Sequence, residues 1–234
     1  MKTQIIRLSF IAAIAASLVS CLPESEYMYT ETGMCTIINS SQLQTDNGQI
    51  FNIVENNSGG VIPDTLLRVM TVCDVLTQVI GKADEYNVRL MEFETAFSSE
   101  PLEKSTMDEE AVGNNGINVN QAWAMGGYLS GYSSIAMLNP SESQHTLNLV
   151  YDDLRSSSDT LFLELRHNAN GECPENTEIP LNSFVFAGSY FSFPIKDLVV
   201  SDKQIIHLEW DWYVGDEYTF TREKKKHTGD IPQK

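Results

Sequence analysis

Apolar and polar residues alternate with a period of two along much of the chain, the spacing of a β-strand that is buried on one face. The clearest run extends from residue 67 to residue 75, where leucine, valine, threonine and cysteine alternate with arginine, methionine, a second valine and aspartate. Shorter β-prone runs cover Gly33–Asn39, Gln49–Val54 and Tyr86–Phe97. The first half of the protein is therefore predicted to be built from short strands.

Turn signals separate these runs. Asp46-Asn47-Gly48 predicts a tight hairpin turn, because Asn and Gly tolerate positive φ. In the last of the runs the apolar register slips between Leu90 and Met91, which predicts a β-bulge. Four or five strands in about 70 residues, without a helical repeat, predict a small barrel or sandwich over residues 33–100.

The second half repeats the pattern after an interruption. Residues 101–116 contain a proline, an acidic cluster and several Gly and Asn residues, a composition that predicts a linker. Strand-like runs with intervening turn signals, Gly126-Gly127 among them, then continue to residue 223, which predicts an antiparallel β-sandwich over 117–223. The polar residues 224–234, with their run of lysines, are predicted to be a frayed tail. The expected fold class is all-β.

The amino terminus carries a targeting signal. Lys2 and Arg7 precede an uncharged apolar run over residues 8–19, which is too short to span a bilayer. The run ends in Leu-Val-Ser followed by Cys21, the pattern of a lipobox, in which the cysteine thiol takes a diacylglyceryl group before cleavage. Residues 1–20 are thus predicted to be a lipoprotein signal peptide and 21–32 an acidic tether. The alternative is an ordinary secretory signal that happens to end at a cysteine.

Composition limits the partners. The formal net charge is −17, which argues against nucleic acid, since phosphate recognition depends on a positive face. No second apolar run of membrane-spanning length follows the signal peptide. The sequence therefore predicts a cell-envelope protein held by lipid to the outer membrane, on its periplasmic face or on the cell surface. Glu24 and Glu26, just after the lipidated cysteine, favour the surface only weakly.

Few residues suggest chemistry. Cys35 and Cys73 lie on two expected strands of the same domain and could form a disulfide, or could equally remain free thiols. His207, Glu209 and Asp211 share one face of a strand and could hold a cation, although a solvated polar face explains them as well. No nucleophile, phosphate-binding or zinc motif occurs in the sequence. We expect no catalytic residues, no metal ion and no cofactor.

The residues after His145 resemble those of a known family. HTLNLVYDD, followed by DTLFLELRHNAN up to Asn170, is similar to the strand-turn-strand of the second domain of the NigD-like lipoproteins of Bacteroidetes, and a weaker likeness covers Leu67 to Phe97. The resemblance extends over most of the mature chain and implies an OB-like first domain, an immunoglobulin-like second domain and a non-catalytic envelope lipoprotein. Only Cys21 carries over as a functional position. The loop 56–64 and the acidic linker depart from the family pattern.

Two functions remain open at this point. Trp123, Tyr128, Tyr132 and Tyr190 could form a platform for a glycan or a peptide, or could simply pack within the sheets. Alternatively, the protein is an envelope-assembly or immunity-type component that acts through contact with another envelope protein. An exposed strand edge would suit such a contact.

Overall fold

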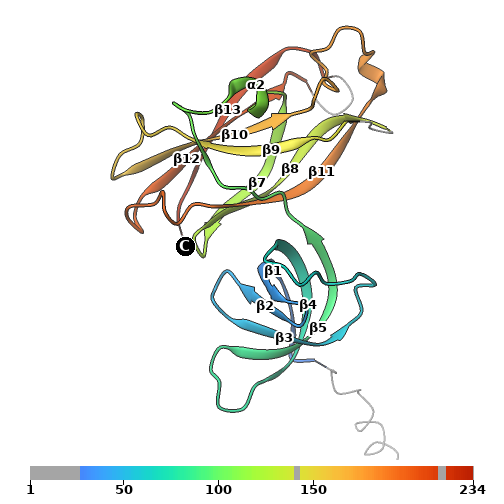
Figure 1. Cartoon of the computed structure of the whole chain (residues 1–234), viewed down its shortest axis with the longest axis vertical. Helices are drawn as coiled ribbons and strands as arrows, with labels where there is room; N and C mark the ends of the chain where they lie inside the picture. The colour runs from blue at the N-terminus through green and yellow to red at the C-terminus, as the bar shows by residue number, and fades with distance from the viewer. Residues whose placement is uncertain (1–26, 140–142, 216–219, 234) are drawn as a thin grey trace, which may run out of the picture.

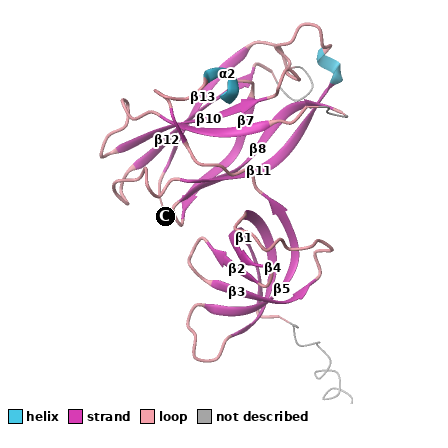
Figure 2. Ribbon diagram, viewed as in Figure 1, coloured by secondary structure: helices cyan, strands magenta, loops and turns pink. Residues whose placement is uncertain are grey.

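The computed structural model describes residues 27–139, 143–215 and 220–233. Two β-structured units follow one another along the long axis of the molecule, the barrel at one end and the sandwich at the other (Figure 1). Strands account for almost all regular structure, and the helices are single short turns (Figure 2). Among the described residues no helix is long and apolar enough to cross a membrane. The predicted signal peptide and Cys21 lie outside the described residues.

The first unit is a closed barrel with the strand order β1-β2-β3-β5-β4. Neighbouring strands are antiparallel except β3 and β5, which run parallel. This is the five-stranded architecture of an OB fold, so the OB-like barrel that the resemblance implied is confirmed. The strands are β1 (Tyr29–Asn39), β2 (Gln42–Thr45), β3 (Ile50–Asn56), β4 (Arg68–Gln78) and β5 (Glu85–Thr95).

Two local predictions in the barrel are confirmed. The turn at residues 46–48 joins β2 to β3, and Gly48 adopts a φ of 83°. On β5, Glu92 pairs with Val72 but Leu90 pairs with Cys73, so Met91 is the extra residue of a bulge. The alternation also sets the core, which contains Ile37, Leu43, Phe51, Val69, Val75, Val88 and Leu90.

The second unit is a β-sandwich, as predicted. One sheet has the order β13-β12-β10-β9-β6 and the other β11-β8-β7. The larger sheet is mixed and not wholly antiparallel as predicted, because β10 and β12 pair in parallel, as do β6 and β9. Between β10 and β12 the chain crosses to the other sheet to form β11 and then returns. The strands are β7 (Ile117–Met125), β8 (Tyr128–Leu138), β9 (Thr146–Tyr151), β10 (Thr160–Asn168), β11 (Phe184–Pro194), β12 (Ile205–Tyr213) and β13 (Lys224–Ile231).

The segment predicted as a linker is instead built into the sandwich. Within residues 101–116 the chain forms β6 (Leu102–Glu103), which pairs with β9, and the short helix α2 (Glu109–Val112). The side chain of Asp108 caps the helix by accepting bonds from the amides of its first turn. The acidic residues that suggested a flexible segment therefore serve as a helix start, a role that composition alone does not reveal. The last residues of the expected tether likewise belong to β1.

The predicted frayed tail is wrong, because β13 is an edge strand paired along β12. Lys226 lies 3.0 Å from a carboxylate oxygen of Glu209, Lys224 lies 3.2 Å from Glu175, and Ile231 is buried. In a chain with a net charge of −17, a lysine-rich strand neutralises an acidic sheet surface. Lysines on an edge strand also discourage further strand addition.

Candidate functional site

A cleft of about 800 Å³ lies between the barrel and the sandwich and is open to solvent. Its lining combines aromatic rings, methionines, amides and carboxylates, and none of the described lining residues is Lys or Arg. The volume falls within the range of small-molecule sites. The principal side chains are Trp123, Tyr132, Tyr190, Met34, Met70, Met125, Asn47, Asn120, Gln121, Glu31, Asp46 and Glu94.

The sandwich wall of the cleft is the outer face of the sheet β11-β8-β7. Gln121, Tyr132 and Tyr190 pair directly across three neighbouring strands, so their side chains stand on the same face. Trp123 lies two residues beyond Gln121 and shares that face. The rings of Tyr132 and Tyr190 contact edge to face with centroids 5.0 Å apart. The strand register therefore places three aromatic rings, one from each strand, on the same face of the sheet.

A bulge in β7 determines which side chains reach this face. The pairing of β7 with β8 shifts between Val119 and Gln121, so Asn120 is the extra residue. Val119 and Ala122 both pack against the sandwich core, which strict alternation would forbid. The bulge therefore turns Gln121 and Trp123 towards the barrel.

The barrel wall is built in the same way. Met34 on β1, Met70 on β4 and Glu94 on β5 pair directly across the three strands. Their neighbours Cys35 and Val69 belong to the barrel core, so this row faces outward. Met34 is nevertheless only 3% exposed. The cleft therefore lies between two cross-strand rows, one from each unit.

Arg68 joins the two units beside the cleft. Within the barrel its guanidinium donates to Thr36 Oγ1 at 2.9 Å and to Asp46 Oδ1 at 2.6 Å. Its Nε donates to Ser192 Oγ of the sandwich at 2.9 Å, and its Cζ lies 3.8 Å above the centre of the Tyr128 ring. Because Arg68 is 4% exposed, these contacts are shielded from water. They fix the spacing of the cleft walls.

Burial of Asp46 has an electrostatic consequence. Desolvation raises the pKa of its carboxyl, and the charge and hydrogen bond of Arg68 oppose that rise. Oδ1 accepts from Arg68, whereas the buried Oδ2 has no hydrogen-bond partner among the described residues. The positive charge of Arg68 thus compensates the charge of Asp46, one of the three carboxylates of the cleft. Glu31 and Glu94 then set the charge of the cleft.

Glu94 and Tyr190 face each other across the cleft. Partial burial raises the pKa of Tyr190, and the nearby charge of Glu94 adds to the effect. On β11, Gly188 leaves the space that the Tyr132 hydroxyl fills, since a Cβ there would collide with it. The absence of a side chain at Gly188 therefore helps to position a cleft ring.

The structure brings together three of the four aromatics that the sequence singled out. Trp123, Tyr132 and Tyr190 line the cleft, whereas Tyr128 lies under the Arg68 guanidinium. Sequence reasoning missed the barrel wall, whose Met34, Met70 and Glu94 are far apart along the chain. The alternation shows that they face outward, but only the strand register shows that they are neighbours.

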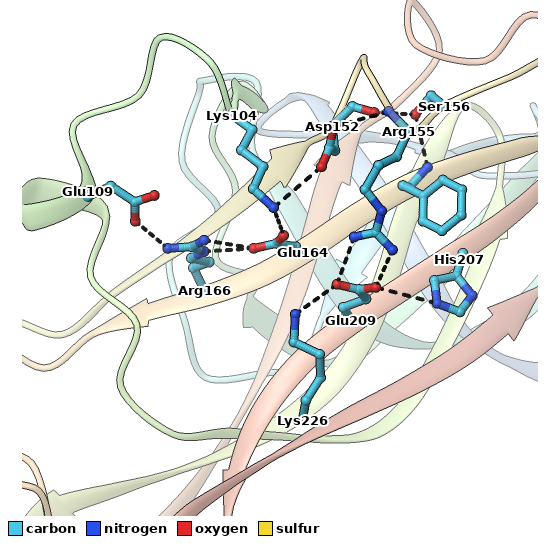
Figure 3. A network of polar contacts seen from close by, with 11 residues as sticks. Lys104, Glu109, Asp152, Arg155, Ser156, Glu164, Arg166, His207, Glu209 and Lys226 are labelled. Carbon is cyan, nitrogen blue, oxygen red and sulfur yellow. Dashed lines mark hydrogen bonds and ion pairs between the residues drawn. The ribbon is translucent and has the colours of Figure 1, made fainter.

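At the cation site considered at His207, Glu209 and Asp211, ion pairs take up Glu209 and His207 (Figure 3). Asp211 accepts a hydrogen bond from Asn114 at 3.0 Å. Arg155 binds Glu209 through two hydrogen bonds of 2.6 and 3.1 Å, and Lys226 contacts the same carboxylate. These bonds hold the pKa of Glu209 at about 2. Among the described residues no cluster of His, Cys, Asp or Glu is arranged to hold a metal ion.

A second charged cluster lies on the same sheet face. Glu164 contacts both Lys104 and Arg166, and Arg166 also reaches Glu109 on α2 at 2.6 Å (Figure 3). Lys104 further approaches Asp152 at 3.4 Å. Positive side chains thus separate the carboxylates of this face, which is a structural network rather than a ligand site.

The cysteines proposed as a disulfide are free, buried thiols in the structure. Cys35 and Cys73 both belong to the barrel core, and Cys35 Sγ lies 3.4 Å from Thr71 Oγ1. Burial raises their pKa values to about 11 and about 12, respectively, which suppresses thiolate reactivity. Pairing of the two remains a prediction.

The comparison with family models decides the affiliation of the chain. A model of the NigD-like C-terminal beta sandwich domain matches residues 98–222. The chain belongs to the NigD-like family. The match covers β6, α2 and the sandwich strands from β7 to β12, in agreement with the inclusion of β6 and α2 in that unit, and it ends before β13. No functionally curated protein matches this NigD-like chain.

Solved structures share the fold of this NigD-like protein at low sequence identity. A protein of unknown function from Bacteroides vulgatus is 20% identical with a TM-score of 0.62, and the alignment covers 87% of this chain and 92% of that one. A NigD-like immunity protein from Bacteroides caccae is 18% identical, with a TM-score of 0.59 and coverages of 85% and 93%. A Bacteroides fragilis protein described as a lipoprotein is 13% identical, with a TM-score of 0.59 and coverages of 88% and 99%.

Proposed function

We propose that this NigD-like protein is a lipid-anchored, non-catalytic binding protein of the cell envelope whose ligand occupies the cleft between barrel and sandwich. The observation that carries the proposal is the convergence of Trp123, Tyr132 and Tyr190 on one sheet face opposite Met34 and Met70. Aromatic rings at a solvent-open cleft, with the partly exposed Met70 and Met125, supply contact area for a ligand. The surrounding amides and carboxylates supply orientation.

The anchor part of the proposal rests on the lipobox that ends at Cys21. Several acyl chains give lasting membrane attachment, and a Bacteroides fragilis protein that shares the fold is described as a lipoprotein. Membrane fractionation of wild type and Cys21→Ala tests the anchor. Wild type is expected in the outer-membrane fraction and the variant in the soluble fraction, whereas identical fractionation would refute lipidation. Protease shaving of intact cells, with a periplasmic protein as control, then assigns the membrane face.

The proposal that the ligand binds in the cleft is tested by removing two of the aromatic rings of the cleft. A Trp123→Ala/Tyr190→Ala protein and the wild type are screened against one array of saccharides and one of peptides. The matched control is Phe162→Ala, which removes a ring from the opposite sheet, where Arg155 stacks on it at 4.3 Å. Binding that the double variant loses and the control keeps supports the cleft. Binding that is the same in all three proteins assigns the ligand elsewhere.

An immunity-type role is the second candidate. It is favoured by the Bacteroides caccae relative, which is named an immunity protein, and by the edge position of β11 in its sheet. A protein partner would add a strand along Phe184–Gly188, where β11 pairs on one side with β8. Val185→Lys, which places a charge at an exposed position of this edge, would then weaken partner binding and leave ligand binding in the cleft intact.

A further inference from the structure

We infer that the cleft between the two units binds a neutral carbohydrate chain. The inference rests on the proposed function and adds the chemical class of the ligand. It depends on three features of the cleft: the arrangement of the rings, the identity of the polar groups and the balance of charge.

The rings offer flat apolar surface where a sugar ring would need it. Trp123, Tyr132 and Tyr190 are each only partly buried, and they come from three adjacent strands of one sheet. Pyranose rings present C–H faces that stack on aromatic rings while their hydroxyl groups point outward. Rings that are held by sheet register lose little conformational freedom on binding. Several rings in one cleft suit several linked sugars.

The polar lining matches hydroxyl groups, which both donate and accept hydrogen bonds. Gln121 and Asn120 on the sandwich offer amides that can do either. Glu94 on the barrel offers acceptor oxygens opposite Tyr190. A ligand rich in hydroxyls is satisfied by such a mixture, whereas an apolar ligand would leave these groups unpaired.

Charge excludes acidic ligands. The described lining contains Glu31, Asp46 and Glu94 and neither Lys nor Arg. Arg68 lies beside the cleft, but its hydrogen bonds go to Thr36, Asp46 and Ser192. A phosphate, sulfate or uronate group would therefore meet carboxylates without a free cation. A neutral saccharide meets no such penalty.

Backbone geometry disfavours a peptide in the same cleft. The side chains that line the cleft stand on sheet faces, and β4 and β8 pair with a neighbour on both sides, so their main-chain groups are used within the sheets. The edges of the smaller sheet are β7 and β11, and a peptide that extended either edge would lie beside the sheet and not over the aromatic rings. A peptide would have to depend on lysine or arginine contacts to Glu31 and Glu94, which salt would weaken.

Isothermal titration calorimetry on the mature protein tests the inference. The probes are neutral hexasaccharides of α-glucan, β-glucan, mannan, galactan and xylan type, sulfated forms of the same sugars, and an unstructured lysine- and arginine-rich peptide. The variants are Trp123→Ala, the conservative Trp123→Phe and the Phe162→Ala control. Thermal unfolding checks that each variant is folded.

We expect at least one neutral hexasaccharide to bind, and Trp123→Ala to weaken that binding at least about tenfold. Trp123→Phe should retain most of the affinity, Phe162→Ala all of it, and the sulfated form should bind more weakly. Raising NaCl from about 0.15 to about 0.5 M should leave the affinity for the neutral sugar unchanged, since no ion pair is screened.

The other outcomes are distinguishable. Peptide binding that requires Trp123 and falls with salt would overturn the carbohydrate assignment and keep the cleft as the ligand site. Binding of a neutral sugar that is insensitive to Trp123 would overturn the cleft as its site. Absence of Trp123-dependent binding by every probe would overturn the carbohydrate inference, and the array screen of the double variant would then decide on the cleft itself.

Discussion

At the scale of single residues, Glu209 shows how the acidic sheet face is stabilised. The residue is 5% exposed, and its carboxylate accepts hydrogen bonds from Arg155 and Lys226. Substitution by Gln leaves both cations without their partner, so we expect Glu209→Gln to lower the free energy of unfolding by about 1–3 kcal/mol near neutral pH. Urea denaturation measures the change. Glu92→Gln, at an exposed position on β5, is the control and should change little.

The same residue predicts a pH dependence. Because the pKa of Glu209 is lowered in the folded protein from 4.5 to about 2, its ionised form stabilises the fold fully above pH 4.5. That contribution is lost as the pH falls from 4.5 towards 2. The stability difference between wild type and Glu209→Gln should therefore shrink over this range. A difference that stays constant on acidification would contradict the ion-pair explanation.

His167 gives a pH dependence in a different range. The ring is 1% exposed, and Nδ1 donates to Gly116 O at 3.1 Å, which leaves Nε2 to accept from His145 Nδ1 at 2.8 Å. Burial lowers the pKa of His167 from 6.5 to about 4. The folded protein therefore favours the neutral ring. The contribution of this ring to the free energy of unfolding is fully present above pH 6.5 and is lost as the pH falls towards 4.

This loss amounts to roughly 3 kcal/mol at most, the free energy equivalent of the pKa change. Urea denaturation between about pH 7 and 4 should show the decline, and His167→Asn should remove most of that slope. NMR titration of the His167 ring gives an independent measurement. A midpoint near 6.5 in the folded protein would refute the assignment of a neutral buried ring.

At the scale of secondary-structure elements, β13 provides the sharpest test. Deletion of residues 224–234 removes the strand that pairs with β12 from Tyr213 to Ile206, and it exposes the edge of a hydrophobic sheet. We expect a lower melting temperature and concentration-dependent self-association, measured by calorimetry and size-exclusion chromatography. The control Lys225→Ala alters an exposed side chain of the same strand and should leave both properties unchanged. A dispensable tail would instead leave the truncated protein monomeric and stable.

Elements also show what the sequence could and could not predict. The hairpin at Gly48 and the bulge at Met91 depend on neighbouring residues, so local patterns were sufficient. The strand β13 lacks apolar alternation, and its lysines contact acidic partners that are distant in the sequence, such as Glu209 and Glu175. The barrel wall of the cleft could not be predicted for a related reason. Alternation assigns a side chain to a face of the sheet but does not identify its cross-strand neighbours.

At the scale of the whole molecule, Arg68 is one of the residues that hold the two units together. Arg68→Met would leave Asp46 as a buried carboxylate without a cation. We therefore expect the free energy of unfolding to fall by about 3–5 kcal/mol. The double substitution Arg68→Met/Asp46→Leu removes both charges and should recover much of this stability. Both proteins lose the bond to Ser192, so small-angle X-ray scattering should show altered packing of barrel against sandwich. Unchanged scattering in the double variant would show that other contacts set the arrangement.

The passage from barrel to sandwich has a consequence for the degradation of the protein. Phe97 donates its amide to Tyr190 O at 2.9 Å and accepts from the amide of Ser192 at 2.8 Å, so the connecting segment is bonded along β11. Proteases cleave segments that can detach and extend into their active sites. This junction resists such detachment. We therefore expect limited proteolysis to release no separate domain, and the protein to be shed or degraded from the cell as a single piece.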